Sequence, residues 1–208
     1  MTNITVMGAA EARVPADQAD VFASVASRDE SREAALQAAN AAHAELVARA
    51  KDLVAEGAAI EYVADPVSTY SNTWRDENGN TVVEHQAHAS VQIVLTALDR
   101  VGEVAAQLTE SGADVRVQWE LSSALRDEWT RNLRSAAVQD ARTAAEDFSA
   151  AIGAPALTLL SLRDGRSGGG GPSPLGDARF ARAAAAPPEV TVGQISVSVQ
   201  VEATFTAE

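Results

Sequence analysis

The chain has 208 residues, of which 46% are apolar and only 4% aromatic, and it carries a formal net charge of −13. This apolar content excludes a disordered polypeptide, and the acidic balance argues against nucleic acid and anionic membrane surfaces as partners. Because the sequence has no cysteine, disulfides, thiolate metal sites and thiol nucleophiles are excluded as well.

Two strands, 4–6 and 19–27, are predicted to precede a long helix over about 29–56. Apolar side chains recur in this helix at three- and four-residue steps, which indicates one buried stripe. Its members are Leu36, Ala39, His43, Leu46, Ala50 and Leu53. Ser27 and Glu30 are predicted to form a capping box at the start of the helix, and Gly57 to end it.

A β-hairpin is predicted over 60–95, with the dipeptide Asn78-Gly79 at its turn. An Asn-Gly pair between two alternating apolar segments is a strong signal for a two-residue turn. The pairs that this turn predicts are Trp74 with Val83, Asn72 with His85 and Tyr70 with Ala87, all on the face of Val91, Ile93 and Leu95.

The second half of the chain is predicted to hold a short helix over 99–111, a strand over 114–122 and a second long helix over about 127–152. The buried stripe predicted for the long helix comprises Trp129, Leu133, Ala137, Ala141, Ala144, Phe148 and Ile152. A strand over 156–162 follows. The last strand, 193–205, alternates apolar and polar residues, so we expect one buried face and one face in water.

The predicted order ββαββαβαββ indicates an α+β fold, in which a largely antiparallel sheet carries two long helices on one face. A strand, a long helix and a hairpin occur twice, over about 19–95 and 114–206, which indicates a degenerate internal duplication. We expect a single domain over 1–208 with a flexible excursion, rich in glycine, proline and arginine, at about 163–189.

Four consecutive glycines in the excursion, 168–171, raise the question of a phosphate-binding loop. Such loops place glycines at defined offsets before a helix and follow them with lysine and serine or threonine. Here Pro172 and Pro174 follow the glycines, and Lys51, the one lysine of the chain, falls within the first long helix. We therefore interpret the segment as a connection and expect no cofactor.

Two groups of residues are candidates for an interface. Tyr70 and Trp74 lie near the hairpin turn, where large aromatic side chains either cap the core under a helix end or contact a subunit or ligand. The excursion is locally basic on an acidic chain, so it is either a solvated loop or a segment that docks on an acidic surface of a neighbouring subunit. Its arginines are Arg163, Arg166, Arg179 and Arg182.

The sequence shows no group of residues typical of a catalytic or metal site. His85 and His88 lie three residues apart on a predicted strand, so their side chains point to opposite faces. We expect His85 to face inward opposite Asn72, and His43 to be partly buried on the helix stripe. A hydrolase that uses His88 with a neighbouring acid is the weakest alternative, because no G-x-S-x-G motif presents a nucleophile.

Three segments together resemble the SIMPL domain family, a bacterial group that includes periplasmic immunogenic antigens and stress-associated proteins. The opening "ITVMGAAEARVPADQADVFASVAS" is similar to the entry strands of the family, with Gly8, Pro15 and Ala19 at matching positions. "PPEVTVGQISVSVQVEATF" is similar to its closing strand. "LRSAAVQDARTAAEDFSAAIG" resembles its alanine-rich second helix, and the matching residues are Asp140, Ala141, Ala145 and Gly153.

The resemblance covers about residues 3–206. It implies no established reaction and no agreed catalytic residues, homo-oligomers in some relatives, and a link to oxidative stress in others. Members are often periplasmic behind a signal peptide. The beginning of this sequence lacks that pattern, so we expect a cytoplasmic location, or a periplasmic or secreted one if a leader was removed.

From these observations we predict a non-enzymatic protein that self-associates or binds other proteins, with a stress-related role as the resemblance implies. We expect a homo-oligomer without cofactor or metal. No window approaches the roughly 20 apolar residues of a membrane-spanning helix, so no membrane partner is predicted. A binding module for a small ligand, housed between the sheet and the long helices, is the alternative.

Overall fold

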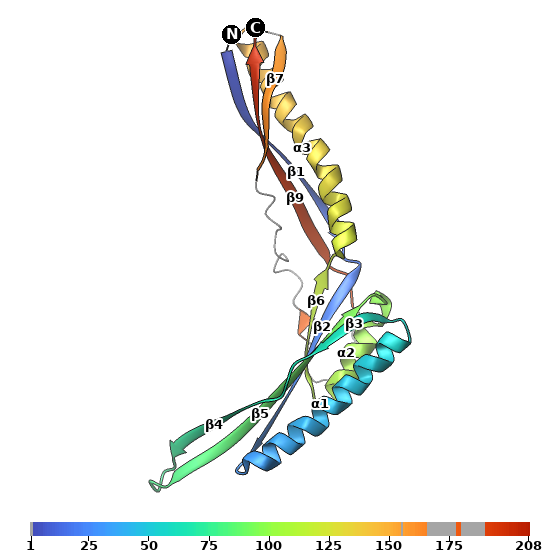
Figure 1. Cartoon of the computed structure of the whole chain (residues 1–208), viewed down its shortest axis with the longest axis vertical. Helices are drawn as coiled ribbons and strands as arrows, with labels where there is room; N and C mark the ends of the chain where they lie inside the picture. The colour runs from blue at the N-terminus through green and yellow to red at the C-terminus, as the bar shows by residue number, and fades with distance from the viewer. Residues whose placement is uncertain (1, 155, 166–177, 180–189) are drawn as a thin grey trace. The chain divides into compact units, whose positions relative to one another are not determined.

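The computed structural model describes residues 2–154, 156–165, 178–179 and 190–208. The described residues form two compact units, each built from separate parts of the chain (Figure 1). Unit 1 draws on the ranges 1–16, 121–174 and 193–208, and unit 2 on 17–120 and 175–192. The chain therefore passes from one unit to the other more than once.

Unit 1 is a three-stranded antiparallel sheet with a long helix on one face. Its strands β1 (Thr2–Pro15), β9 (Gln194–Ala207) and β7 (Leu157–Asp164) lie in the order β1-β9-β7. Helix α3 (Ser123–Ala151) lies mainly over β1 and β9. The predicted alternation of β9 is confirmed, and its buried residues are Ile195, Val197, Val199, Val201, Ala203, Phe205 and Ala207.

Strand β1 and helix α3 approach each other closely at Gly8. A Cβ atom at this position would lie 2.1 Å from the carbonyl oxygen of Ala137 and 2.7 Å from the Cβ of Ala141. One residue on, the backbone N–H of Ala9 donates to Oδ2 of Asp140 at 3.0 Å. Residues that carry the family resemblance, Gly8, Asp140 and Ala141, thus have packing and hydrogen-bonding roles in unit 1.

The buried stripe of α3 is made of smaller residues than the sequence predicts. It comprises Leu133, Ala137, Ala141, Ala145 and Ser149. The prediction that Phe148 and Ile152 belong to this stripe is wrong, since these side chains are 58% and 53% exposed. The stripe advances by four residues at each step. Its members from Ala137 onward are small, because the close approach to β1 at Gly8 admits only small side chains.

Unit 2 is a six-stranded antiparallel sheet with two helices. The strands are β2 (Gln18–Asp29), β3 (Ala59–Ala64), β4 (Ser68–Arg75), β5 (Thr81–Leu95), β6 (Asp114–Glu120) and β8 (Ala178–Arg179). They follow the order β3-β5-β2-β6-β8, with β4 also paired to β5. Helix α1 (Arg32–Ala55) packs on β5, β2 and β3, whereas η1 (Leu98–Arg100) leads into α2 (Val101–Glu110), which packs mainly on β6.

The predicted core of unit 2 is largely confirmed. Its buried residues include Val115, Val117, Trp119 and Leu121 around β6, Val101, Val104, Ala105 and Leu108 on α2, and Ala39, Leu46, Ala50 and Leu53 on α1. The predicted start of α1 is three residues early, because Ser31 caps the helix by accepting from the N–H of Ala34 at 3.4 Å. Ser27 instead donates to the carbonyl oxygen of Ala35.

The α+β class is confirmed, but the strands form two sheets, and each sheet carries one of the two long helices. Each unit contains a strand, a long helix and two further strands, β2-α1-β3-β5 in unit 2 and β1-α3-β7-β9 in unit 1. In both sheets the last of these strands lies between the other two. The strand expected to begin the second set, β6, pairs with β2 instead. The N-terminal strand β1 takes that place in unit 1.

Candidate interaction surface

The turn between β4 and β5 is longer than the two-residue turn that the sequence predicts. Arg75 pairs with Thr81, and the backbone N–H of Asp76 donates to the carbonyl oxygen of Asn80 at 2.9 Å, so three residues form the loop. Gly79 has a φ of 81°, in the left-handed region. A glycine in that conformation is typical of three-residue hairpin loops.

The carboxylate of Asp76 holds this loop together. It accepts from the backbone N–H groups of Asn78 and Asn80 at 2.9 and 2.8 Å, and from Nδ2 of Asn80 at 3.0 Å. The side-chain bond to Asn80, followed by the backbone bonds, lowers the pKa of Asp76 below its usual value. The stabilisation that these bonds add is therefore present above pH 3.8 and is lost as the pH falls through the lower, folded-state pKa.

The extra loop residue shifts the hairpin register by one, so the predicted pairs are wrong. The observed pairs are Trp74 with Val82, Asn72 with Glu84 and Tyr70 with Gln86. Opposite residues share a face of a sheet. Tyr70 and Trp74 therefore lie on the face opposite to that of Ala87, which packs against Ala35 and Ala39 of α1.

We call residues 70–86 the arm. Its aromatic side chains are uncovered: Tyr70 is 54% and Trp74 46% exposed. Strand β2 ends where Asp29 pairs with His85, so beyond that pair the arm consists of two strands. In Figure 1 the tip of the β4–β5 hairpin lies away from α1. The aromatic pair therefore does not cap the core under a helix end.

Polar contacts order the side chains of the arm. The hydroxyl of Tyr70 donates to Oε1 of Gln86, and Nε2 of Gln86 donates to Oε2 of Glu84 at 2.7 Å. On the other face, the Oγ of Ser71 lies 2.7 Å from Nδ1 of His85. The partner of His85 is thus Ser71 and not the predicted Asn72, again because of the one-residue shift.

The predicted arginines are distributed over both units. Arg163, on β7 of unit 1, lies 3.6 Å from Glu202 and has a 79% exposed side chain. The backbone of Arg179 pairs with Arg116 in unit 2. Arg166 and Arg182 fall outside the described residues, as do the four glycines. Tyr70 and Trp74 therefore belong to a different unit from Arg163.

The histidines form no metal-binding group. His88 is exposed, and Nε2 of the half-buried His43 is enclosed without a hydrogen-bond partner in the described structure. Among the residues placed in the structure, no three His, Asp or Glu side chains are arranged to hold a metal ion.

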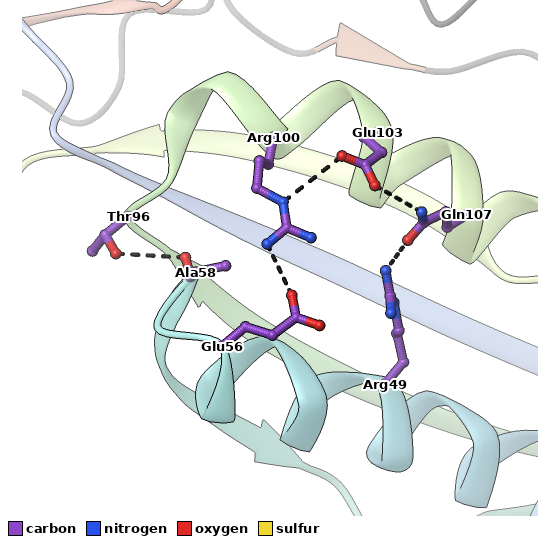
Figure 2. Close-up of polar contacts among 7 residues, drawn as sticks. All are labelled: Arg49, Glu56, Ala58, Thr96, Arg100, Glu103 and Gln107. Atoms are coloured by element: carbon purple, nitrogen blue, oxygen red, sulfur yellow. Dashed lines mark hydrogen bonds and ion pairs between the residues drawn. The ribbon is translucent and has the colours of Figure 1, made fainter.

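A cluster of polar contacts joins the two helices of unit 2 (Figure 2). Arg100 lies 2.9 Å from Glu56 at the end of α1 and 3.7 Å from Glu103 of α2. Gln107 donates to Glu103 at 2.9 Å and accepts from Arg49 of α1. The bond with Glu56 raises the pKa of Arg100. The ion pairs of this cluster are partly exposed, so they tie α1 to α2 with modest energy.

The sequence analysis missed that unit 1 exposes several large apolar side chains. Leu159, Leu160 and Leu162 of β7 form what we call the leucine strip, and Phe148 of α3 and Ile152, the residue after α3, are exposed as well. The leucines are 48%, 56% and 46% exposed. The available signal was the sequence "LTLLSL", in which leucines outnumber polar residues and do not follow the strict alternation of a half-buried strand.

Comparisons with known proteins identify a family but no activity. The family model SIMPL, described as "Protein of unknown function (DUF541)", matches residues 4–205 and therefore spans both units. A search of functionally curated proteins finds none that matches the chain. Among the helices that the structure describes, none is long and apolar enough to cross a membrane.

Proposed function

We propose that this chain, which belongs to the SIMPL family, is a non-enzymatic protein that acts by associating with copies of itself. The observation that carries this proposal is the arm, with Tyr70 and Trp74 half exposed on the face that α1 leaves free. Aromatic side chains are enriched in the buried centres of protein interfaces. A stretch of only two strands is also marginally stable in water, so a covering surface would stabilise it.

Charge defines the kind of surface that the arm would contact. The arm holds Asp76, Glu77 and Glu84 against Arg75, which gives three negative charges and one positive, a net charge of −2 without counting His85. Two arms would repel each other. We therefore propose that the arm contacts a more basic part of a neighbouring copy, for which the exposed Arg163 is a candidate.

Size-exclusion chromatography with light scattering tests this proposal. At tens of micromolar the wild-type chain should have a mass well above the 21.6 kDa of one copy. The double variant Tyr70→Ser, Trp74→Ser should form an assembly of lower mass, because the substitutions remove the aromatic contacts between copies while the fold of each copy stays intact. Thr73→Ala, an exposed residue on the opposite face of the same strand, is the matched control and should assemble as the wild type does. A monomeric wild type, or an unchanged mass in the double variant, would refute the proposal.

The proposal also includes a stress-related role, which is supported by the family resemblance alone. If the assembly serves in stress tolerance, a strain that carries only the Tyr70→Ser, Trp74→Ser variant should survive an oxidant less well than one carrying Thr73→Ala. Equal survival of the two strains would remove this part of the proposal while leaving self-association in place.

A further inference from the structure

We infer that a second copy of this chain pairs with the free edge of β7, so that the leucine strips of two copies meet across a two-fold axis. This surface belongs to unit 1, whereas the arm belongs to unit 2. The inference therefore goes beyond the proposed function, and it can hold even if the arm contacts no copy.

Strand β7 is open in two directions. Among the described strands it pairs with β9 alone, so the N–H and C=O groups of its other edge have no strand partner. Because α3 lies mainly over β1 and β9, it covers the helix-side face of β7 only in part. Arg134 of α3 lies 3.7 Å from Asp164 of β7, whereas Leu159 and Leu162 stay about half exposed. The opposite edge of this sheet is partly protected, since Asp140 accepts from the N–H of Ala9. An exposed apolar edge strand is a template for pairing with another chain.

The apolar pattern of β7 is self-complementary. A register shift between residues 159 and 161 places Leu159 opposite Phe205 and Leu162 opposite Ala203. Phe205 and Ala203 are both buried on the α3 side, so the two leucines share that face although they are three residues apart. Antiparallel pairing about a two-fold axis between residues 160 and 161 sets Leu159 of each copy opposite Leu162 of the other.

Charge and area are consistent with a second copy as the partner. Strand β7 carries one arginine, Arg163, and one aspartate, Asp164, so it has no net charge in a chain whose net charge is −13. Like-charge repulsion is therefore absent where two β7 strands would meet. Exposed apolar patches of this kind cover roughly a few hundred Å². A standard interface buries about 800 Å² on each partner, so this contact is smaller. We accordingly expect a dimer that dissociates in the micromolar range.

Cross-linking tests the register directly, because the chain has no cysteine of its own. Two full-length variants, Leu159→Cys and Leu162→Cys, are oxidised separately and as a mixture at tens of micromolar. Residues directly opposite each other have Cβ atoms about 4.5–5.5 Å apart, within reach of a disulfide after slight adjustment. The mixture should yield several times more covalent dimer, of twice 21.6 kDa, than either variant alone.

Three further samples make the outcome decisive. A mixture of Leu159→Cys with Ser161→Cys is the control and should yield little dimer, because Ser161 pairs with Thr204 on the other face of the sheet. Leu159→Asn, Leu162→Asn should abolish the β7 dimer while keeping the circular dichroism spectrum, since both leucines are half exposed. Cysteine variants that also carry Tyr70→Ser, Trp74→Ser should still cross-link, which separates this interface from the arm. The inference is overturned if the Leu159→Cys and Leu162→Cys mixture cross-links no more than the separate variants.

Discussion

The two units share one topology but differ in how completely their sheets are covered. In unit 2, α2 and β6 extend the set formed by β2, α1, β3 and β5, and the Arg100 contacts tie α2 to α1. In unit 1, α3 is the one described helix on a three-stranded sheet, and it lies mainly over β1 and β9, so the leucines of β7 stay about half exposed. The same strand–helix–hairpin plan thus packs under two helices in unit 2 and under one helix in unit 1.

The packing also differs between the units. The buried stripe of α1 combines Leu46 and Leu53 with three alanines, so large side chains fill part of its contact with the sheet. From Ala137 onward, the stripe of α3 consists of alanines and Ser149, and its backbone reaches β1 at Gly8. Unit 1 therefore packs its sheet against one helix, which approaches β1 closely at Gly8, whereas unit 2 spreads its core over two helices.

The largest expected effect comes from filling that close contact. Gly8→Ala would bring a Cβ within 2.6 Å of the Ala141 nitrogen and 2.1 Å of the Ala137 oxygen, and these backbone atoms cannot rotate away. We expect a loss of about 3 kcal/mol or more in the free energy of unfolding. Hydrogen exchange should show reduced protection of β1 and α3 and unchanged protection of α1.

Gly112→Ala is the control for this substitution. Gly112 has a φ of 88° with no atom within 4 Å of its Cβ position, so alanine there meets backbone strain and no clash. Gly112→Ala should lower the free energy of unfolding by about 1 kcal/mol, and the loss of hydrogen-exchange protection should be confined to unit 2. If Gly8→Ala costs no more than Gly112→Ala, the close contact does not hold unit 1 together.

A smaller effect should follow from removing the helix caps. Ser122 accepts from the N–H of Leu125 at 3.2 Å at the start of α3, as Ser31 does from Ala34 at the start of α1. Ser122→Ala and Ser31→Ala should each cost about 1 kcal/mol. Exchange measurements should show the loss across all of unit 1 for Ser122→Ala, but mainly in the first turns of α1 for Ser31→Ala, because α2 still covers part of the second sheet.

Variants that keep a hydrogen-bond acceptor at the cap test whether the lost capping bond causes the loss of stability. Ser122→Asp and Ser31→Asp retain a capping oxygen and add a favourable charge at a helix N-terminus. They should restore wild-type stability. If Ser122→Ala and Ser31→Ala each reduce hydrogen-exchange protection over the same share of their unit, the single helix of unit 1 stabilises its sheet as well as the two helices of unit 2 stabilise theirs.

The smallest effect concerns Asp20, on the helix-free face of β2. Burial raises the pKa of its carboxyl, the neighbouring Glu120 and Glu61 raise it further, and a 2.9 Å bond from Gln92 opposes the shift. A raised folded-state pKa stabilises the fold below pH 3.8, and that stabilisation is lost as the pH rises through the folded-state value. Asp20→Asn should therefore unfold at a slightly higher denaturant concentration than the wild type at pH 7, by less than the cap effect.

The pH dependence of this difference is its own control. At pH 3 the carboxyl is mostly protonated in both folded and unfolded chains, so the wild type and Asp20→Asn should unfold at nearly the same denaturant concentration. A difference that persists at pH 3 would point to packing, not charge, as the cause. No change at pH 7 would contradict the raised pKa.

Local patterns in the sequence predicted the elements well. The alternation of β6 and β9 and the stripe of α2 were read correctly, because burial on one face imposes a period that the sequence carries. The membership of β1 and β6 in their sheets was not predictable in this way. Thr2 pairs with Ala207 at the other end of the chain, and no local pattern records such a partner.

The candidate surfaces were predicted only in part. Tyr70 and Trp74 were identified from their place near the turn, but their face depends on the carboxylate of Asp76, whose bonds favour a three-residue loop over the two-residue turn that Asn78-Gly79 suggests. The exposure of Phe148 was missed, because the helix pattern alone does not reveal that Gly8 selects small residues in the facing helix.

The pairing of β1 with β9 has a consequence for synthesis of the protein. Residues 17–120 can collapse around α1 as soon as they leave the ribosome, since β2 and its neighbours β5 and β6 all lie within that stretch. Strand β1, in contrast, must wait for β9, because residues 16–193 lie between the two strands. Nascent chains should therefore carry an unpaired β1 until β9 has been made, and a ribosome stalled before residue 194 should display β1 to proteases and chaperones.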